Sequence, residues 1–262
     1  MKISLGQIKI EFENKEINKA ACIECIKDAR KASSDFIIFP EMTLTGFSMN
    51  TDFIGENNSE TIEWFRNTAL DYGIAIGFGH VVKKENKYEN SFTIVDSKGH
   101  ILLTYAKLHP FSYSLENNYY EKGNEILCTE LKAFIVSPFI CYDLRFPEIF
   151  QIASKEASLI TVAANWPESR RDNWITLLKA RAIENQCYIA AVNICGTADD
   201  INYCGDSLIV DPIGNIIADA SSKAQVVTAE ILPEVVNRYR TNFPLKKDRR
   251  EDLYKIKAAK RV

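Results

Sequence analysis

Three segments of the chain each place a residue that is capable of chemistry close after an apolar run. Glu41 follows the run FIIF, Lys107 lies in YAKLHPF, and Cys141 lies in FICYDLRFPE. Side chains displayed where strands end are commonly those that bind or react. A carboxylate, an ammonium and a thiol can serve as general base, oxyanion stabiliser and nucleophile. Together these segments predict an enzyme that works through a cysteine.

Each of these residues also has an ordinary structural explanation when it is taken by itself. Glu41 could be a solvated carboxylate at a strand exit, Lys107 could reach out to water, and Cys141 could be inert packing. Two effects favour chemistry instead. Burial after an apolar run would raise the pKa of Glu41 toward the range of a general base. Backbone N–H groups and a helix dipole after Cys141 would favour its thiolate and could bind an oxyanion.

A metal centre is not expected from the histidines and cysteines. His80, His100 and His109 have no ligand spacing among them, so a zinc site is unsupported. Cys22 and Cys25 form a C-x-x-C inside a helical pattern, without the strand, glycine and proline of a redox loop, which predicts packing. Seven cysteines, an odd number, are too few for a disulfide scaffold and favour a reducing compartment.

Size and charge restrict the class of partner. With 262 residues, 46% of them hydrophobic, the chain can bury one sizeable core. A net charge of −3 gives no general attraction to nucleic acid or to anionic membranes, so we expect neither as a partner. The beginning of the chain lacks a signal-peptide pattern, and no apolar run reaches the roughly 20 residues of a membrane span. We therefore predict a cytoplasmic protein that acts on a small molecule.

The hydrophobic pattern predicts strands that alternate with helices. Strands are expected over 2–10, 35–40, 73–82, 91–99, 100–108, 133–141, 158–165, 188–195 and 224–231, and a hairpin over 207–220. Helices are expected over 15–32, 59–72, 145–157 and 171–186. Hairpins mixed with strand–helix–strand units favour a mixed sheet or a pair of helix-covered sheets. Since no linker interrupts the pattern, we predict a single α/β domain over 1–245 and a charged tail over 246–262, solvated or in contact with a second copy of the chain.

The three segments resemble, in order, the glutamate, lysine and cysteine motifs of the nitrilase superfamily, the carbon–nitrogen hydrolases. FPEMTLTGF, YAKLHPF and CYDLRFPE carry this resemblance, which extends from about residue 2 to residue 254. The stretches ANWPESRRDNWITLLKARAIENQCYIAAVN, YCGDSLIVDPIGNII and FPLKKDRREDLY resemble the omega-amidase branch. True nitrilases usually carry tryptophan and glutamate directly after the cysteine, whereas this chain has Tyr142 and Asp143. The resemblance therefore implies amide hydrolysis, not nitrile hydrolysis.

The resemblance also implies a fold, an assembly and a set of roles. It implies a four-layer αββα sandwich, a homodimer or higher homo-oligomer, and a reaction that requires no metal or organic cofactor. By resemblance, Cys141 attacks the amide carbonyl, Glu41 transfers the proton, and Lys107 and the backbone N–H of Tyr142 stabilise the oxyanion. Glu116 matches a second glutamate that would position Lys107 or the substrate; the alternative is an exposed loop carboxylate.

The omega-amidase resemblance implies a substrate such as 2-oxoglutaramate or 2-oxosuccinamate, whose distal carboxylate must meet a cation. Arg170 is the candidate, with Asn165 and Trp166 in the same segment, because a guanidinium binds a carboxylate in bidentate fashion. Arg145 is the competitor, unless it holds Asp143 by a salt bridge. Two alternatives remain open: an amidase for deaminated glutathione or an N-carbamoyl amine, and a non-catalytic interaction module with this fold.

Overall fold

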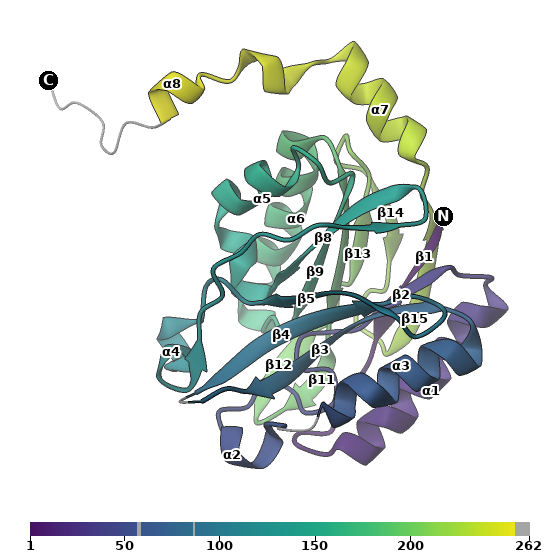
Figure 1. Ribbon diagram of the computed structural model, residues 1–262, viewed down its shortest axis with the longest axis vertical. Helices are drawn as coiled ribbons and strands as arrows, with labels where there is room; N and C mark the ends of the chain where they lie inside the picture. Colours follow the sequence, from purple (N-terminus) through teal and green to yellow (C-terminus); the bar gives the residue numbers. More distant parts are fainter. Residues whose placement is uncertain (57–58, 86, 255–262) are drawn as a thin grey trace, which may run out of the picture.

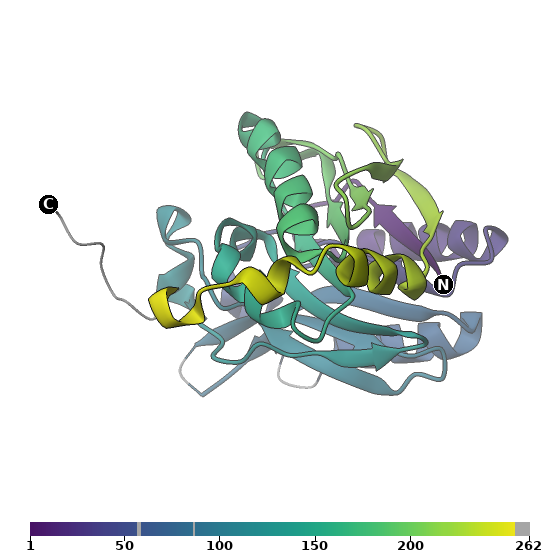
Figure 2. The same cartoon turned by 90° about the horizontal axis from the view of Figure 1, so that it is seen from above.

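The computed structural model describes residues 1–56, 59–85 and 87–254 as two sheets packed face to face (Figures 1 and 2). The first sheet contains β1 (Lys2–Gln7), β2 (Phe36–Ile38), β3 (Ala75–Lys83), β4 (Tyr88–Val95), β5 (Ile101–Ala106), β6 (Tyr120–Glu121) and β15 (Gln225–Glu230). The second contains β7 (Thr129–Leu131), β8 (Phe134–Ile140), β9 (Leu159–Ala164), β10 (Tyr188–Asn193), β13 (Leu208–Val210) and β14 (Ile216–Asp219). A separate pair is formed by β11 (Cys195–Ala198) and β12 (Ile201–Cys204).

Helices cover the outer face of each sheet. The α-helices are α1 (Lys15–Lys31), α2 (Thr51–Ile54), α3 (Glu60–Tyr72), α4 (Glu116–Tyr119), α5 (Pro147–Ala153), α6 (Arg171–Asn185), α7 (Pro233–Asn242) and α8 (Glu251–Tyr254). Figure 1 shows α1 and α3 against the first sheet and α5 and α6 against the second. The predicted single-domain αββα sandwich is thereby confirmed. Each sheet carries apolar side chains on both faces, so one face packs against the other sheet and the other face packs against helices, which gives four layers.

Two apolar clusters hold the layers together. Between the sheets, residues such as Leu5 and Phe92 of the first sheet meet Phe139 of the second, all fully buried. A second cluster lies between the first sheet and its helices, where the ring of Phe65 stacks on Phe78 with centroids 4.0 Å apart. Complete burial of a side chain of this size stabilises the fold by about 1.5–3 kcal/mol.

Local signals account for the longest helix, α1. The Asn14 side chain accepts a hydrogen bond from the N–H of Ile17 and caps the first turn, while Arg30 falls in the last turn, where a cation opposes the helix dipole. Cys22 and Cys25 lie on the buried face of this helix, as the packing interpretation of the C-x-x-C predicts.

The topology brings the three candidate segments to one end of the sandwich. In the first sheet β2 runs parallel to β3, and β3–β4 and β4–β5 are antiparallel, so β2, β3 and β5 all point the same way. Glu41 follows β2 and Lys107 follows β5. In the second sheet β8 and β9 are parallel, and Cys141 and Asn165 follow them directly. Residues that follow the carboxyl ends of strands pointing the same way lie at the same edge of a sheet. Since the edges of the two sheets are adjacent here, the site lies between the sheets.

Some boundaries and small elements differ from the sequence expectation. The first strand ends at Gln7 and not at residue 10, while β7, β11, β12 and α7 were not anticipated. The chain from α7 to α8 forms an arm: Lys246 donates to the Ser154 hydroxyl, and Arg249 donates to Gln151 on α5. Residues 255–262 of the predicted tail lie outside the described residues. Within the described part, no helix is long and apolar enough to cross a membrane.

Candidate active site

Lys107 is buried between two glutamates at the centre of the site. Its Nζ lies 2.8 Å from Oε1 of Glu41 and 2.9 Å from Oε2 of Glu116. Asn90, on β4, donates its Nδ2 to Oε1 of both Glu41 (2.8 Å) and Glu116 (3.0 Å). The backbone N–H of Phe111 donates to Oε2 of Glu116, so this carboxylate is also held from the loop that carries it. We call Glu41, Asn90, Lys107 and Glu116 the inner cluster.

Asn165 connects Glu41 to the cysteine. Its backbone N–H donates to Oε2 of Glu41 at 3.0 Å, and its side-chain amide donates to the Glu41 carbonyl at 2.7 Å. On the other side of the same residue, the carbonyl oxygen of Asn165 lies 3.9 Å from Sγ of Cys141. A single residue therefore contacts both the carboxylate and the thiol.

The inner cluster sets the charge of its members. Burial alone would raise the pKa of Glu41, but Lys107, Asn90 and the Asn165 N–H outweigh it and hold that pKa below its usual value. The expected raised pKa is therefore wrong in direction, although Glu41 is buried as expected. Burial by itself would lower the pKa of Lys107, but the charges of Glu116 and Glu41 outweigh it and raise that pKa well above the usual lysine value. Burial and the charge of Glu41 raise the pKa of Glu116, against the effect of Lys107.

Cys141 opens a 3-10 turn, η2 (Cys141–Arg145), that leads into α5. Its φ angle of +46° lies in the left-handed region, which a non-glycine residue rarely adopts. Burial and the neighbouring charge of Glu41 raise the pKa of its thiol well above the usual value, against a smaller effect of Lys107. The expectation that a helix dipole would favour the thiolate is therefore wrong: η2 separates Cys141 from the first turn of α5, and the nearest carboxylate favours the neutral thiol.

Asp143 anchors the turn that carries Cys141. Its Oδ2 accepts from the Tyr105 hydroxyl at 2.7 Å and from the Ile140 N–H at 3.1 Å. Its Oδ1 accepts from the backbone N–H of His109 at 3.0 Å and contacts Nδ1 of the same residue at 2.8 Å. The suggested Arg145–Asp143 salt bridge is wrong, because these partners occupy the carboxylate and no ion pair of Arg145 occurs among the described residues. His109 thus joins the lysine segment to the cysteine segment.

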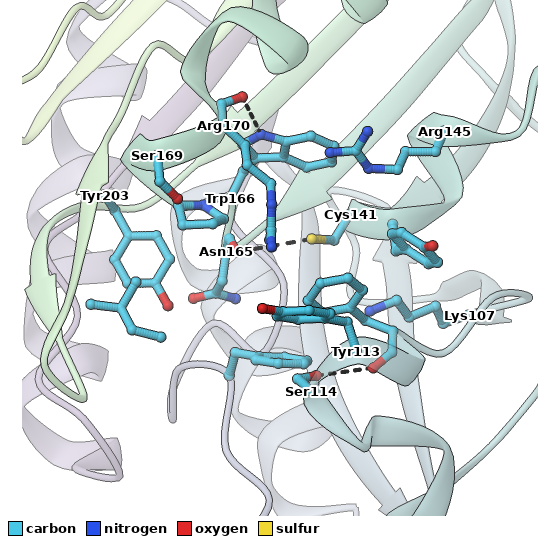
Figure 3. A pocket seen from close by; sticks show the side chains of 15 residues that line it. Lys107, Tyr113, Ser114, Cys141, Arg145, Asn165, Trp166, Ser169, Arg170 and Tyr203 are labelled. Atoms are coloured by element: carbon cyan, nitrogen blue, oxygen red, sulfur yellow. Dashed lines mark hydrogen bonds between the residues drawn. The ribbon is translucent and has the colours of Figure 1, made fainter.

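A cavity of about 340 Å³ opens beside the cysteine (Figure 3). It is lined by Phe47, Lys107, Phe111, Tyr113, Ser114, Cys141, Tyr142, Arg145, Asn165, Trp166, Pro167, Ser169, Arg170, Ile201 and Tyr203. Three cations line it, and none of its described lining residues is an aspartate or glutamate. The walls are largely aromatic, which is typical of a small-molecule site with a few charged groups that orient the ligand.

Both arginines of the cavity lie over aromatic rings, and Arg145 also donates to Oδ1 of Asn173 at 3.4 Å. The guanidinium of Arg145 lies 4.9 Å from the ring centroid of Trp166, and that of Arg170 lies 5.3 Å from the ring of Phe111 and 5.4 Å from that of Tyr113. Neither arginine forms an ion pair with a described residue. The Trp166 indole N–H donates to the Arg170 carbonyl at 2.8 Å, which fixes the backbone from which Arg170 projects.

All of the residues selected from the sequence come together here. Cys141, Lys107, Tyr142, Asn165, Trp166, Arg145 and Arg170 line the cavity, while Glu41 and Glu116 lie directly behind Lys107. Five further residues of the site were not predicted from the sequence: Asn90, Phe47, Phe111, Tyr113 and Tyr203. Asn90 falls just before the strand expected over 91–99, and Tyr203 falls outside every expected element, so neither gave a recognisable signal. No group of three or more potential metal ligands occurs among the described residues.

Residues 2–241 match the carbon–nitrogen hydrolase family. The chain therefore belongs to the carbon–nitrogen hydrolase family, which confirms the predicted class of a hydrolase that acts on non-peptide carbon–nitrogen bonds in linear amides.

Individual relatives cover nearly the whole chain. It is 37% identical to a 2-oxoglutaramate amidase of Bacillus subtilis over 258 residues, 96% of this chain and 98% of that protein. It is also 37% identical to an omega-amidase of Yersinia enterocolitica, over 80% of this chain and 82% of the relative. Among solved structures, a carbon–nitrogen hydrolase superfamily protein of Xanthomonas campestris is 32% identical, with a TM-score of 0.89 and coverage of 95% and 96%. The predicted resemblance to the omega-amidase branch is confirmed by these similarities.

Proposed function

We propose that this chain is an omega-amidase that hydrolyses the terminal amide of 2-oxo acids such as 2-oxoglutaramate and 2-oxosuccinamate. The observation that carries the proposal is the pair of guanidinium groups, Arg145 and Arg170, in a cavity whose described lining has no carboxylate. An arginine that has no anionic partner in the protein and lies beside the cysteine thiol can bind a carboxylate group of the substrate. The names of the relatives from Bacillus and Yersinia agree with this substrate class.

In the proposed first step, Sγ of Cys141 bonds to the carbon of the substrate amide while its proton passes to Glu41. The direction of both pKa shifts suits this transfer, because the thiol is neutral and the carboxylate ionised before attack. The neutral thiol loses its proton only as the new carbon–sulfur bond forms, which is general-base catalysis. Collapse of the tetrahedral intermediate then breaks the carbon–nitrogen bond, and Glu41 returns the proton to the departing ammonia.

The oxyanion formed in that step would be stabilised by Lys107 and by the backbone N–H of Tyr142. An ammonium has three N–H bonds. In this structure Lys107 donates to Oε1 of Glu41 and to both carboxylate oxygens of Glu116. We assign a single N–H to the two oxygens of Glu116, which leaves the third N–H for the cavity that Lys107 lines. Removal of one such donor typically costs about 2.7–4 kcal/mol of transition-state stabilisation. In this scheme Glu116 is a positioning residue, because it orients Lys107 and does not contact the substrate.

The second half of the proposed reaction consumes water. The thioester carbon is attacked by a water molecule whose proton passes to Glu41, and the carbon–sulfur bond breaks as the thiol is reprotonated. The products are ammonia and the dicarboxylate. Each step moves one proton between Glu41, Cys141 and the substrate, so this chain's own residues suffice.

Assembly, compartment and tail are part of the same proposal. Exposed apolar side chains, Ile152 on α5, Ile183 on α6 and Phe243 after α7, support at least a homodimer, which the described part of the tail, 246–254, would contact. No cysteine of the described residues forms a disulfide, which agrees with a reducing, cytoplasmic environment. Small-angle scattering of the purified chain would test the assembly.

The proposed function is tested by ammonia release from 2-oxoglutaramate, 2-oxosuccinamate, glutamine, asparagine, an N-carbamoyl amine and a simple nitrile. We expect the two 2-oxo acid amides to turn over fastest. Cys141→Ala should lower the rate by at least about 10⁴-fold, as loss of a nucleophile does elsewhere. Cys128→Ala removes an exposed thiol and serves as the matched control. Faster turnover of another amide with the same cysteine dependence would reject the omega-amidase assignment, and full activity of Cys141→Ala would reject the mechanism.

A further inference from the structure

Five tyrosines are buried in the described part of the chain, and four of them have a hydrogen-bond partner for the hydroxyl. Tyr105 donates to Asp143 at 2.7 Å, Tyr120 to the Ser48 carbonyl at 2.6 Å and Tyr88 to Asp52 at 2.8 Å, and Tyr188 accepts from the Leu232 N–H at 3.5 Å. This is the usual state of a buried phenol, since a hydroxyl removed from water without a partner costs free energy.

The fifth, Tyr203 on β12, is only 7% exposed, and its hydroxyl has no hydrogen bond to any residue of the described ranges. Its ring lines the same cavity as Cys141 and Arg170, and Figure 3 shows the hydroxyl turned inward, on the side of Asn165. A ring that is packed and a hydroxyl that faces the cavity together indicate a group whose partner is the ligand.

The neighbours of Tyr203 limit what that partner can be. Burial, and the nearby Cys141 and Glu41, raise the pKa of the phenol, so it stays protonated and can donate. A substrate carboxylate has two guanidinium groups available in the same cavity, and these bind an anion better than a neutral hydroxyl does. The group left for Tyr203 is a neutral oxygen acceptor that lies between the carboxylate and the reacting amide of the substrate.

We propose that the Tyr203 hydroxyl donates a hydrogen bond to the 2-oxo oxygen of the substrate and thereby selects 2-oxo acid amides over their unsubstituted analogues. The inference rests on the proposed function and goes further by assigning one residue to one substrate atom. A substrate without the 2-oxo group leaves the buried hydroxyl unpartnered, and such a loss is a main source of discrimination between substrates. Tyr203 is in this sense a specificity-determining residue that takes no part in proton transfer.

The test compares three amides in wild type and Tyr203→Phe. 2-Oxosuccinamate and succinamate differ only in the 2-oxo oxygen, and propanamide lacks the carboxylate as well. We expect Tyr203→Phe to lower kcat/KM for 2-oxosuccinamate by about 5- to 15-fold, the effect of one neutral hydrogen bond, and to leave the other two within about 2-fold. Tyr239→Phe removes a hydroxyl from α7, away from the cavity, and is the matched control.

Thermal unfolding of the same variants separates recognition from packing. Because the Tyr203 hydroxyl has no protein partner, Tyr203→Phe should unfold at the temperature of the wild type or above it. A lower unfolding temperature, an equal loss for all three amides, or no loss for 2-oxosuccinamate would each overturn the inference. If the wild type hydrolyses propanamide but neither carboxylated amide, the proposed function itself is wrong. That outcome is seen in the wild type alone, so it can be told apart from a failure of the Tyr203 inference, which is seen only in the comparison with Tyr203→Phe.

Discussion

The inner cluster of Glu41, Asn90, Lys107 and Glu116 is buried and its charges are paired within it, whereas the two guanidinium groups on the opposite side of the cavity have no ion-pair partner among the described residues. Lys107 has a carboxylate on either side at 2.8 and 2.9 Å. Arg145 and Arg170 instead lie over aromatic rings and have no ion-pair partner among the described residues. We call Arg145, Arg170 and Tyr203 the outer wall.

The difference separates two tasks within one cavity. A buried charge is tolerated when its partners are already in place, and groups fixed in advance need no rearrangement during reaction. The inner cluster therefore suits chemistry that is the same for every amide. In the proposed function, the groups of the outer wall obtain their partners from the ligand and so decide which amide is bound. Substitutions in the inner cluster should lower kcat for all substrates, and those in the outer wall should change kcat/KM selectively.

Among substitutions in the inner cluster and the outer wall, the largest effect is expected from Lys107→Met, which leaves two buried carboxylates without their cation. Loss of an oxyanion donor should lower kcat by about 10²–10³-fold, and breaking a buried ion pair should cost about 3–5 kcal/mol of stability. The unpaired carboxylates acquire raised pKa values in the folded state, so the deficit should shrink as the pH falls and they become protonated. Urea unfolding at pH 7 and at pH 5, together with ammonia release, measures both effects.

Lys27→Met is the matched control, because Lys27 is exposed and its pair with Glu24 lies on the surface of α1. Surface pairs contribute about 0–1 kcal/mol, so this variant should unfold nearly as the wild type does. Adding Glu116→Gln to Lys107→Met removes one of the two uncompensated charges and should restore part of the stability. If Lys107→Met were as stable as Lys27→Met, the ion pairs within the inner cluster would contribute little to the free energy of unfolding.

Prediction from sequence identified residues that the structure brings together at the site, but it failed on their electrostatics. Glu41, Lys107 and Cys141 could be found because each stands close after an apolar strand, which is a local signal. The pKa directions could not be found, since Glu41 meets Lys107 from 66 residues away and Asn90 from 49 residues away. Asn90 itself precedes the predicted strand over 91–99, whereas β4 begins at Tyr88, so its inward position was not recognisable.

The fold was predicted for a similar reason, with similar limits. Long periodic segments such as α1 and α6 and the buried strands β8 to β10 carry their own signal. The β11–β12 pair has only four residues in each strand and no regular alternation of burial, so it was not anticipated. Because Tyr203 lies on that pair, the residue with the unpartnered hydroxyl could not be assigned to the cavity before the structure was known.

On the outer wall, Arg170→Ala should raise KM for 2-oxosuccinamate by about 10- to 100-fold, the effect of a charge-assisted hydrogen bond. Its kcat should change little, because no group of the inner cluster contacts Arg170. Propanamide, which has no carboxylate, should be hydrolysed within about 2-fold of the wild-type rate. Steady-state kinetics with both amides measure the difference.

Arg145→Ala is the matched variant for that experiment. The competing assignment gives the carboxylate to Arg145, which would then show the selective rise in KM while Arg170→Ala would not. An equal loss for charged and uncharged amides in both variants would contradict a role for either guanidinium in recognition. Arg170→Lys keeps the charge without the planar pair of donors and should recover only part of the affinity.

The smallest effect is expected from Asn90→Ala, which removes one hydrogen bond from the Glu41 carboxylate. That bond helps to hold the pKa of Glu41 low, so its loss should raise the pKa. In the proposed mechanism Glu41 is ionised when it accepts the thiol proton, so the acidic limb of kcat/KM should move to higher pH. Asn237→Ala on α7 should leave the profile unchanged. An acidic limb that stays in place would mean that Lys107 and Asn165 alone hold Glu41 ionised.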